Sequence, residues 1–418
     1  MEIYTDVKGR TGIDCGGFCE FCFYKNVNFS NLNPTGCINC PPHQKGCLYC
    51  LDFVERVYTE FIPIYQVLAD INKKLKILKP NEIKPKDIKV IVAGAADILN
   101  YPKLYELVSI LKESLFNIHL GYTSGKPIKN EVMVENLISL GVDEVSFSVF
   151  STNPELRRKW MKDNSPVDSI KGLKLFCENI DLHASAVVIP GINDKDQIFE
   201  TCANLEEWGA KTLILRRFAN YQNQGLIFNK KPIIEGITPH SYEKFQEFVQ
   251  KVSDEFSFEV FGYPFFDPKN EGPFCLAKPD NKVYLQNLPE VRSEVTLITG
   301  ELAAPFLKKI FNSVDESNLV NVVAVNKEIA DLITIEDLDL IDLTEVKSKV
   351  IIPRGALVHD REAEKILCKD GKQRKIKRGP LVLTYPGIGG DKHLTNKIKL
   401  IEYELKSLKE LIEIINTI

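Results

Sequence analysis

The feature that most constrains the fold is a regular alternation of short β-branched runs with amphipathic segments between residues 88 and 216. Runs rich in strand-forming residues predict strands at Ile88–Ala93, Ile118–Thr123, Glu144–Val149, Leu182–Ile189 and Thr212–Arg216. Segments with helical periodicity lie between them, near residues 101–115, 130–140, 165–179 and 194–208. Alternation of this kind predicts an α/β fold with a parallel sheet covered by helices. With one further strand just before Cys15, we expect six βα units.

Three cysteines near the N-terminus, Cys15, Cys19 and Cys22, have the spacing C-x3-C-x2-C. Iron–sulfur clusters are normally held by four cysteine thiolates. A [4Fe–4S] cluster held by three would keep one iron with an open coordination position, which is typical of a catalytic rather than a structural metal site. Gly16 and Gly17 allow the backbone to wrap closely around such a cluster. A buried group of cysteines, or part of a zinc site, remains an alternative to a cluster.

A second group of cysteines follows directly, at Cys37, Cys40, Cys47 and Cys50. Its paired C-x2-C spacing can place four thiolates around one ion, and a tetrahedral set of thiolates suits zinc or iron. Four protein ligands complete the shell, so we expect a structural mononuclear site in a loop at residues 30–50. The metal would largely specify the conformation of so small a loop.

The cysteine triad Cys15, Cys19 and Cys22, with its glycines, resembles that of the radical S-adenosylmethionine (SAM) enzymes. The resemblance implies a partial (β/α)6 barrel and a [4Fe–4S] cluster whose open iron chelates the amino and carboxylate groups of SAM. It also implies that an electron from the cluster splits SAM and leaves a 5′-deoxyadenosyl radical. Phe21, just before the third cysteine, matches the aromatic residue that usually lies against the adenine in this family.

Ligands in parallel α/β folds bind beyond the carboxyl ends of the strands, so the residues there are the next candidates. Gly94 and Ala95 follow the predicted strand 88–93, where the family carries a segment whose backbone meets the SAM amino group. This chain lacks that segment's Glu and Pro and has Asp97 nearby. The resemblance implies further SAM contacts at strand ends, at Ser146, Ser148, Val188 and Gly191.

The remaining chain predicts additional elements and a second domain. A long helix is expected over residues 51–79, kinked at Pro63. We expect the radical SAM barrel to span residues 1–260, a linker 261–290, and a C-terminal α/β domain 291–418. That domain should end in a helix whose apolar stripe belongs to the core, formed by Ile401, Leu405, Leu408, Ile412 and Ile415. The basic segment 369–380 is expected to be a solvated loop or a surface for an anionic group or a partner.

Composition excludes several classes. Net charge is −4 and the chain lacks an interleaved basic and aromatic face, which argues against nucleic-acid binding. Its apolar runs are shorter than a transmembrane helix, so no membrane association is expected. The N-terminus lacks the apolar core of a signal peptide, and a cytoplasmic location is therefore expected.

The order of the cysteine triad, the four-cysteine loop, the barrel and the C-terminal pattern TGELAAPFLKKIF resembles a narrower family, the methanogenesis-marker radical SAM methyltransferases. This resemblance implies methylation of an arginine in the alpha subunit of methyl-coenzyme M reductase. It also implies base-off cobalamin associated with the C-terminal domain, an electron donor, and Tyr122 as a catalytic residue that can occupy the open iron. The chain has no D-x-H-x-x-G segment, so no histidine can be assigned below the cobalt.

Two alternatives remain open at this stage. The first is a radical SAM enzyme that modifies peptides without cobalamin. The second is a non-catalytic binding module that zinc stabilises. Bound corrinoid in the isolated protein would argue against the first alternative, and labile sulfide would argue against the second.

Overall fold

The computed structural model describes residues 1–26, 58–77, 84–225, 227, 231–269, 274–384 and 397–418. These described residues form two compact units. The first is made of residues 1–25, 58–77, 84–218 and 233–264, and the second of residues 26, 219–225, 227, 231–232, 265–269, 274–384 and 397–418. The expected metal loop at Cys37, Cys40, Cys47 and Cys50 lies outside the described residues. Each described helix is too short or too polar to cross a bilayer.

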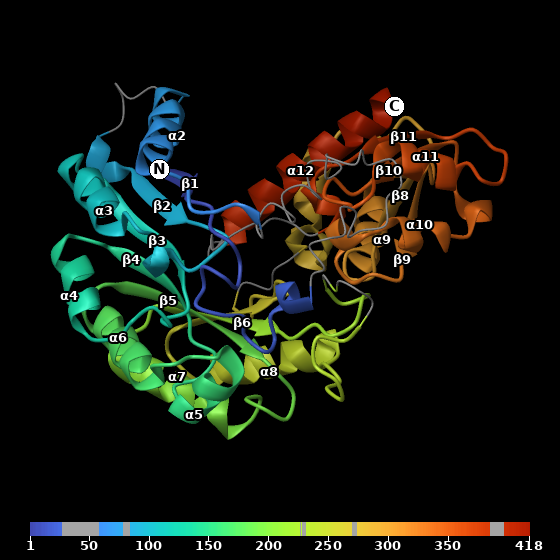
Figure 1. Cartoon of the computed structure of the whole chain (residues 1–418). Coiled ribbons are helices and arrows are strands. Elements are labelled where there is room, and N and C mark those ends of the chain that lie inside the picture. The colour runs from blue at the N-terminus through green and yellow to red at the C-terminus, as the bar shows by residue number, and fades with distance from the viewer. Residues whose placement is uncertain (27–57, 78–83, 226, 228–230, 270–273, 385–396) are drawn as a thin grey trace. The chain divides into compact units, whose positions relative to one another are not determined.

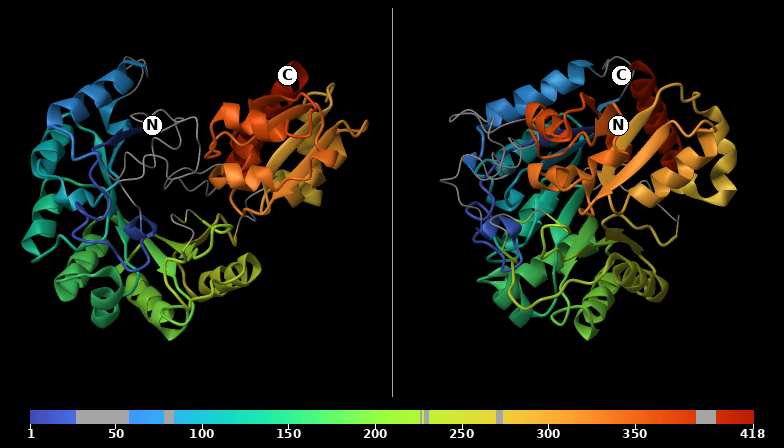
Figure 2. Two further views of the ribbon diagram at one scale, coloured as in Figure 1. Left: turned by 45° about the vertical axis from the view of Figure 1, so that its right-hand side comes forward. Right: turned by 90° about the vertical axis from the view of Figure 1, so that its right-hand side faces the viewer.

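The first unit is built on a seven-stranded parallel sheet whose strands follow chain order (Figures 1 and 2). The strands are β1 (Glu2–Asp6), β2 (Lys89–Ala93), β3 (Asn117–Thr123), β4 (Glu144–Ser148), β5 (Asp181–Val188), β6 (Thr212–Arg217) and β7 (Glu259–Tyr263). In the described residues β1 pairs only with β2 and β7 only with β6, so the sheet is open. The predicted α/β partial barrel is confirmed, with seven strands rather than six because β7 extends the sheet.

Helices cover one face of this sheet. They are α2 (Ile64–Ile77), α3 (Leu104–Glu113), α4 (Val132–Ser139), α5 (Pro154–Leu156), α6 (Pro166–Asn179), α7 (Asp196–Trp208) and α8 (Tyr242–Glu255). Alternate strand residues point toward them, and Val90, Val92, Ile118 and Leu120 are fully buried there. The opposite face, below called the inner face, carries the intervening residues of each strand.

The helix predicted over residues 51–79 is partly wrong in the described part of the chain. Residues 59–63 are not helical, and α2 begins only at Ile64, directly after Pro63. Proline has no N–H to donate and its ring clashes with the preceding turn, so it precedes a helix more easily than it sits inside one. Phe61 instead forms an isolated antiparallel bridge with Lys8, which ties this segment to the residues after β1.

The second unit contains a four-stranded parallel sheet in the order β11-β10-β8-β9. Its elements are β8 (Val295–Gly300), α9 (Ala304–Val314), β9 (Val320–Val325), α10 (Ile335–Asp339), β10 (Lys349–Ile352), α11 (Asp360–Leu367), β11 (Lys375–Arg378) and α12 (Lys397–Thr417). Every residue of the central strand β8 is buried, as expected for a parallel strand covered on both faces. Part of the basic segment 369–380, expected as a loop, is thus the edge strand β11.

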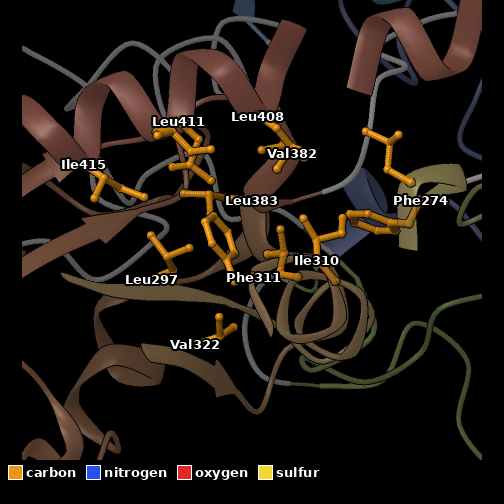
Figure 3. Packing of buried hydrophobic residues seen from close by; sticks show 14 of the residues in the cluster. Phe274, Leu297, Ile310, Phe311, Val322, Val382, Leu383, Leu408, Leu411 and Ile415 are labelled. Atoms are coloured by element: carbon orange, nitrogen blue, oxygen red, sulfur yellow. The ribbon is translucent and has the colours of Figure 1, made fainter. Parts of the chain in front are cut away.

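Figure 3 shows the larger of the two apolar layers of this unit, where α9 and α12 pack on the sheet. Ile401, Leu408, Ile412 and Ile415 of α12 are buried in it, which confirms the predicted role of this stripe. The segment 261–290, expected as a linker, contributes Phe274, Cys275, Leu276 and Leu285 to the same layer. A second layer, on the other face, includes residues of α10 and α11.

Candidate functional site

The cysteine triad lies in a turn that follows β1. Gly16 and Gly17, between the first two cysteines, have φ angles of +74° and +106°, values that favour glycine. The Gly12 N–H donates to Cys15 Sγ at 3.3 Å, and the Gly17 N–H donates to the Gly12 carbonyl at 2.8 Å. The turn therefore has the tight backbone that the sequence predicted around the cysteines.

Two hydrogen bonds connect this turn and the residues before it to the loop at the carboxyl end of β2. Thr11 Oγ1 donates to the Ala95 carbonyl at 2.9 Å, and the Ala95 N–H donates to the Lys8 carbonyl at 3.1 Å. A Cβ added at Gly94 would lie 2.3 Å from the Lys8 carbonyl oxygen, so only glycine permits this close approach. The expected SAM contacts Gly94 and Ala95 therefore lie beside the triad turn, at the end of β2.

The three thiols fit an iron–sulfur cluster in their chemistry. All three are free cysteines. Burial raises the pKa of the Cys15 thiol to about 11, and burial with repulsion from Cys19 and Cys15 raises that of Cys22 to about 12. Metals bind the thiolate, and iron would supply the positive charge that buried, mutually repelling thiolates require. Among the described residues, no group of three His, Cys, Asp or Glu side chains is spaced to hold a single ion.

Tyr122 reaches the same place because of a local irregularity in β3. The register between β3 and β4 shifts between Leu120 and Thr123, so two residues, Gly121 and Tyr122, stand opposite one residue of β4. A β-bulge of this kind redirects side chains and is frequent next to active sites. Without the shift, Tyr122 would follow Ile118 and Leu120 toward the helices.

Tyr122 lies at the carboxyl end of β3, and its electrostatic environment includes the triad. Burial raises its pKa well above the ordinary value, and charges on Cys15, Cys19, Asp97 and Cys22 raise it further. Electrostatic coupling to all three cysteines places Tyr122 in the neighbourhood of the triad. Tyr122 and the three thiols therefore converge at one edge of the sheet.

An apolar wall stands beside Cys19. Phe21 stacks on Phe150, with ring centroids 4.9 Å apart and planes 23° from parallel. Phe150 is fully buried and has a φ of +59°, an uncommon conformation for a bulky residue and one that is found preferentially at functional sites. Ile189 and Phe218 belong to the same cluster. This wall is the surface on which an adenine ring would lie in the arrangement expected for Phe21.

The expected contacts Ser146 and Ser148 have different surroundings. Both lie on β4 in register positions of the inner face. Ser146 Oγ is 2.8 Å from His119 Nε2 and is engaged in a polar network further down the strands. Ser148 ends β4 and is partly exposed at the carboxyl edge. Of the two serines, Ser148 therefore lies closer to the residues that surround the triad.

The network below Ser146 centres on Glu144. Its carboxylate forms an ion pair with Lys89 and lies 3.2 Å from His119 Nδ1 and 3.6 Å from His183 Nε2. Burial alone would raise the pKa of Glu144, but hydrogen bonds from His119, His183 and Lys89 outweigh it and lower that pKa strongly. The network joins strands β2 to β5 at their amino ends and holds the sheet that positions the site.

Val188 and Gly191 mark the end of β5. The Val188 side chain is fully buried and points to the helix side, while Gly191 is exposed in the following loop with a φ of +74°. Asn193 shapes this loop, because its Oδ1 accepts from the Ile189 N–H at 2.7 Å. Its Nδ2 donates to the carbonyls of Phe150 and Val187. Any contact of Val188 with a cofactor would have to use its backbone.

Three residues around the triad were not identified as site residues from the sequence. Asp97 is fully buried and accepts hydrogen bonds from the N–H and hydroxyl of Ser124 at 2.7 and 2.6 Å. Arg157 is fully buried and donates to the carbonyls of Ser124 and Val149, which follow β3 and β4. Lys126 is 4% exposed and donates to the Gly17 carbonyl at 2.6 Å. For Asp97 and Lys126 the available signal was a charged residue four and three positions beyond the end of a strand, whereas Arg157 lies nine positions beyond β4 and had no such signal.

A comparison with families of known proteins identifies one similarity. Residues 11–202 match the family model described as the Radical SAM superfamily, so this segment is a radical SAM domain. The superfamily consists of enzymes, and membership of the domain in it implies that a [4Fe–4S] cluster and SAM are bound. The matched segment contains the triad, Tyr122 and the strand ends described above. No curated protein matches the chain.

Two solved structures illustrate the range of similarity. SuiB of Streptococcus suis is 15% identical with a TM-score of 0.40, covering 62% of this chain and 49% of SuiB. A radical SAM methyltransferase from Sphaerobacter thermophilus is 14% identical with a TM-score of 0.37, covering 62% of this chain and 64% of that protein. This chain thus spans about half the length of SuiB, and the assignment of the domain rests on the family match.

Proposed function

We propose that this protein is a cobalamin-dependent radical SAM methyltransferase that methylates the sp3 δ-carbon of an arginine in the alpha subunit of methyl-coenzyme M reductase. The observation that carries the radical SAM part is the convergence of three free thiols and Tyr122 at one edge of the sheet. The methyl acceptor and the cobalamin are proposed from the resemblance of the sequence to the methanogenesis-marker family.

The chemistry of the acceptor requires such a site. The δ-carbon of arginine has no lone pair and a non-acidic C–H, so it cannot act as a nucleophile, and a side chain of ordinary pKa cannot deprotonate it. When bound, the cluster with SAM supplies hydrogen-atom abstraction and methylcobalamin supplies the methyl group.

The protein's own residues would hold and shield these groups. Cys15, Cys19 and Cys22 would ligate three irons, and Tyr122 would occupy the fourth when SAM is absent. Phe21 with the apolar wall would cover the adenine and exclude water from the reacting face. The second unit would bind the cobalamin, and the Cys37–Cys50 loop would hold one iron or zinc ion.

The first test is anaerobic purification after expression with cobalamin, with iron, sulfide, zinc and corrinoid quantified together. About four sulfides per chain are expected from one [4Fe–4S] cluster. No sulfide after reconstitution would contradict the radical SAM assignment. Sulfide without bound corrinoid would favour a peptide-modifying enzyme that does not use cobalamin.

The second test is methylation of a peptide that carries the alpha-subunit arginine, with SAM deuterated on its methyl group. The labelled methyl should appear on the arginine δ-carbon by mass spectrometry, and a Cys19→Ala variant should give none. A peptide with lysine at that position is the substrate control. Formation of 5′-deoxyadenosine without a methylated peptide would contradict the proposed reaction.

A further inference from the structure

Lys126 is a buried cation at the edge of the cysteine triad. It follows β3 by three residues and is 4% exposed. Its Nζ donates to the Gly17 carbonyl at 2.6 Å and lies 3.9 Å from Cys19 Sγ. The ammonium therefore contacts two parts of the triad turn, the Gly17 backbone between Cys15 and Cys19 and the thiol of Cys19.

The described residues place no carboxylate in an ion pair with this ammonium. The buried acids of the site have other partners, Asp97 with Ser124 and Leu99, and Asp163 with Arg157. A comparably buried lysine in the second unit, Lys327, lies 3.2 Å from the Asp337 carboxylate. A buried ammonium is unfavourable unless an opposite charge lies close to it. For Lys126, the thiolates of the triad are the groups in position to supply that charge.

A bound cluster is negatively charged, so the positive charge of Lys126 would affect its reduction potential. A [4Fe–4S]2+ cluster with three thiolates carries a net charge of −1, and one electron from a low-potential donor makes it −2. A fixed positive charge close to the cluster favours the more negative state, because Coulomb attraction in a buried site is only weakly screened. Cluster potentials respond to net charge and to hydrogen bonds near the sulfurs.

We propose that Lys126 is a positioning residue that fastens the Cys15–Cys19 turn and raises the reduction potential of the cluster bound by the triad. The inference rests on the proposed radical SAM function and adds a residue that neither the motif nor the strand-end pattern assigns. The two proposed roles can be tested separately. The hydrogen bond to Gly17 requires only a hydrogen-bond donor, whereas the effect on the reduction potential requires a positive charge.

The test compares Lys126→Met, Lys126→Gln and Lys126→Arg with the wild type, each reconstituted anaerobically without SAM. Lys129→Met is the matched control, since Lys129 Nζ donates to the Lys126 carbonyl and to Ser165 and has no hydrogen bond to a described cysteine. Iron and sulfide are measured first, and the cluster midpoint potential is then obtained by redox titration followed by electron paramagnetic resonance (EPR). Dithionite is the one-electron reductant.

A more negative midpoint potential is expected for Lys126→Gln and Lys126→Met, with Lys126→Arg and Lys129→Met close to the wild type. Loss of the cluster in both neutral variants, but not in Lys126→Arg, would also support a requirement for the charge. A fully loaded Lys126→Gln protein with the wild-type potential would overturn the proposal. So would an equal loss of cluster in all three Lys126 variants.

These outcomes are distinguishable from failure of the proposed function. A wild type that binds a cluster and shows the Lys126-dependent potential, yet methylates nothing, would contradict the methyltransferase and leave this inference standing. A wild type without iron and sulfide would overturn both.

Discussion

Arg157 shows how strongly the role of a single residue depends on its burial. It lies in a π-helical turn, Arg157–Met161, next to the basic residues Arg158 and Lys159. Arg157 and its partner Asp163 are both fully buried and 2.8 Å apart, whereas Arg158 is exposed and pairs with Glu155. The sequence gives no periodicity that would separate these neighbours, so a buried clamp across β3 and β4 could not be predicted from it.

Substituting Arg157 with glutamine should lower the free energy of unfolding of the first unit by about 3–5 kcal/mol, because Asp163 would be left as an unpaired buried charge. Arg158→Gln, which removes an exposed ion pair, should change it by less than about 1 kcal/mol. Urea unfolding of the two variants measures this difference. Equal effects would show that burial of the pair contributes little.

Tyr122→Phe should leave the iron and sulfide content of the reconstituted protein unchanged and alter the EPR spectrum of the SAM-free cluster. The phenylalanine ring preserves the packing, while the oxygen that lies near Cys15, Cys19 and Cys22 is lost. Tyr101→Phe is the control, since its hydroxyl donates to the Ile62 carbonyl at 3.1 Å. A Tyr122→Phe spectrum identical to that of the wild type would remove Tyr122 as an iron ligand.

At the scale of elements, the strands and helices of the first unit follow from periodicity, and their irregularities do not. The predicted strands lie within one residue of β2 to β6. Strict alternation, however, would have placed Tyr122 on the helix side, and only the bulge at Gly121 and Tyr122 turns it inward. The helix expected across Pro63 failed because apolar spacing in residues 51–79 was given more weight than the missing proline N–H.

Helix α12 of the second unit carries a buried acid, Glu404, and we expect its contribution to stability to depend on pH. Glu404 is 1% exposed and accepts hydrogen bonds from the N–H groups of Cys275 and Leu276, each at 2.9 Å. Burial raises its pKa from 4.5 to about 7, and the hydrogen bonds only partly oppose this. The folded state therefore favours the protonated acid.

The sign of the effect follows from this raised pKa. The contribution of Glu404 to the free energy of unfolding should be largest below pH 4.5, fall as the pH rises to about 7, and stay constant above it. The total loss should be at most about 3 kcal/mol. Glu404→Gln should remove this component, and Glu402→Gln, exposed on the same helix, should not. Urea unfolding at pH 4.5, 6 and 8 tests it, and parallel pH profiles of wild type and Glu404→Gln would contradict it.

At the scale of the whole molecule, the sequence predicted the class of fold because alternation is repeated along the chain. It did not predict that the inner face would be joined by Glu144, His119, His183 and Lys89, since these residues are far apart in sequence and meet only in the register of the sheet. The edge strand β11 was missed for a related reason. The basic residues of this segment suggested a solvent-exposed loop. Arg374, directly before β11, is however 4% exposed and donates to the Leu343 and Val346 carbonyls.

The two compact units each bury a hydrophobic core, and this predicts the unfolding behaviour of the whole chain. We expect two calorimetric transitions, because a unit with its own core can lose its structure independently. Leu111→Ala, on α3 of the first unit, and Leu411→Ala, on α12 of the second, remove side chains that are at most 1% exposed. Each should destabilise its own unit by about 2–5 kcal/mol and lower the Tm of one transition, leaving the other unchanged. A single transition, or a shift of both transitions by one substitution, would show that the two cores unfold as one cooperative unit.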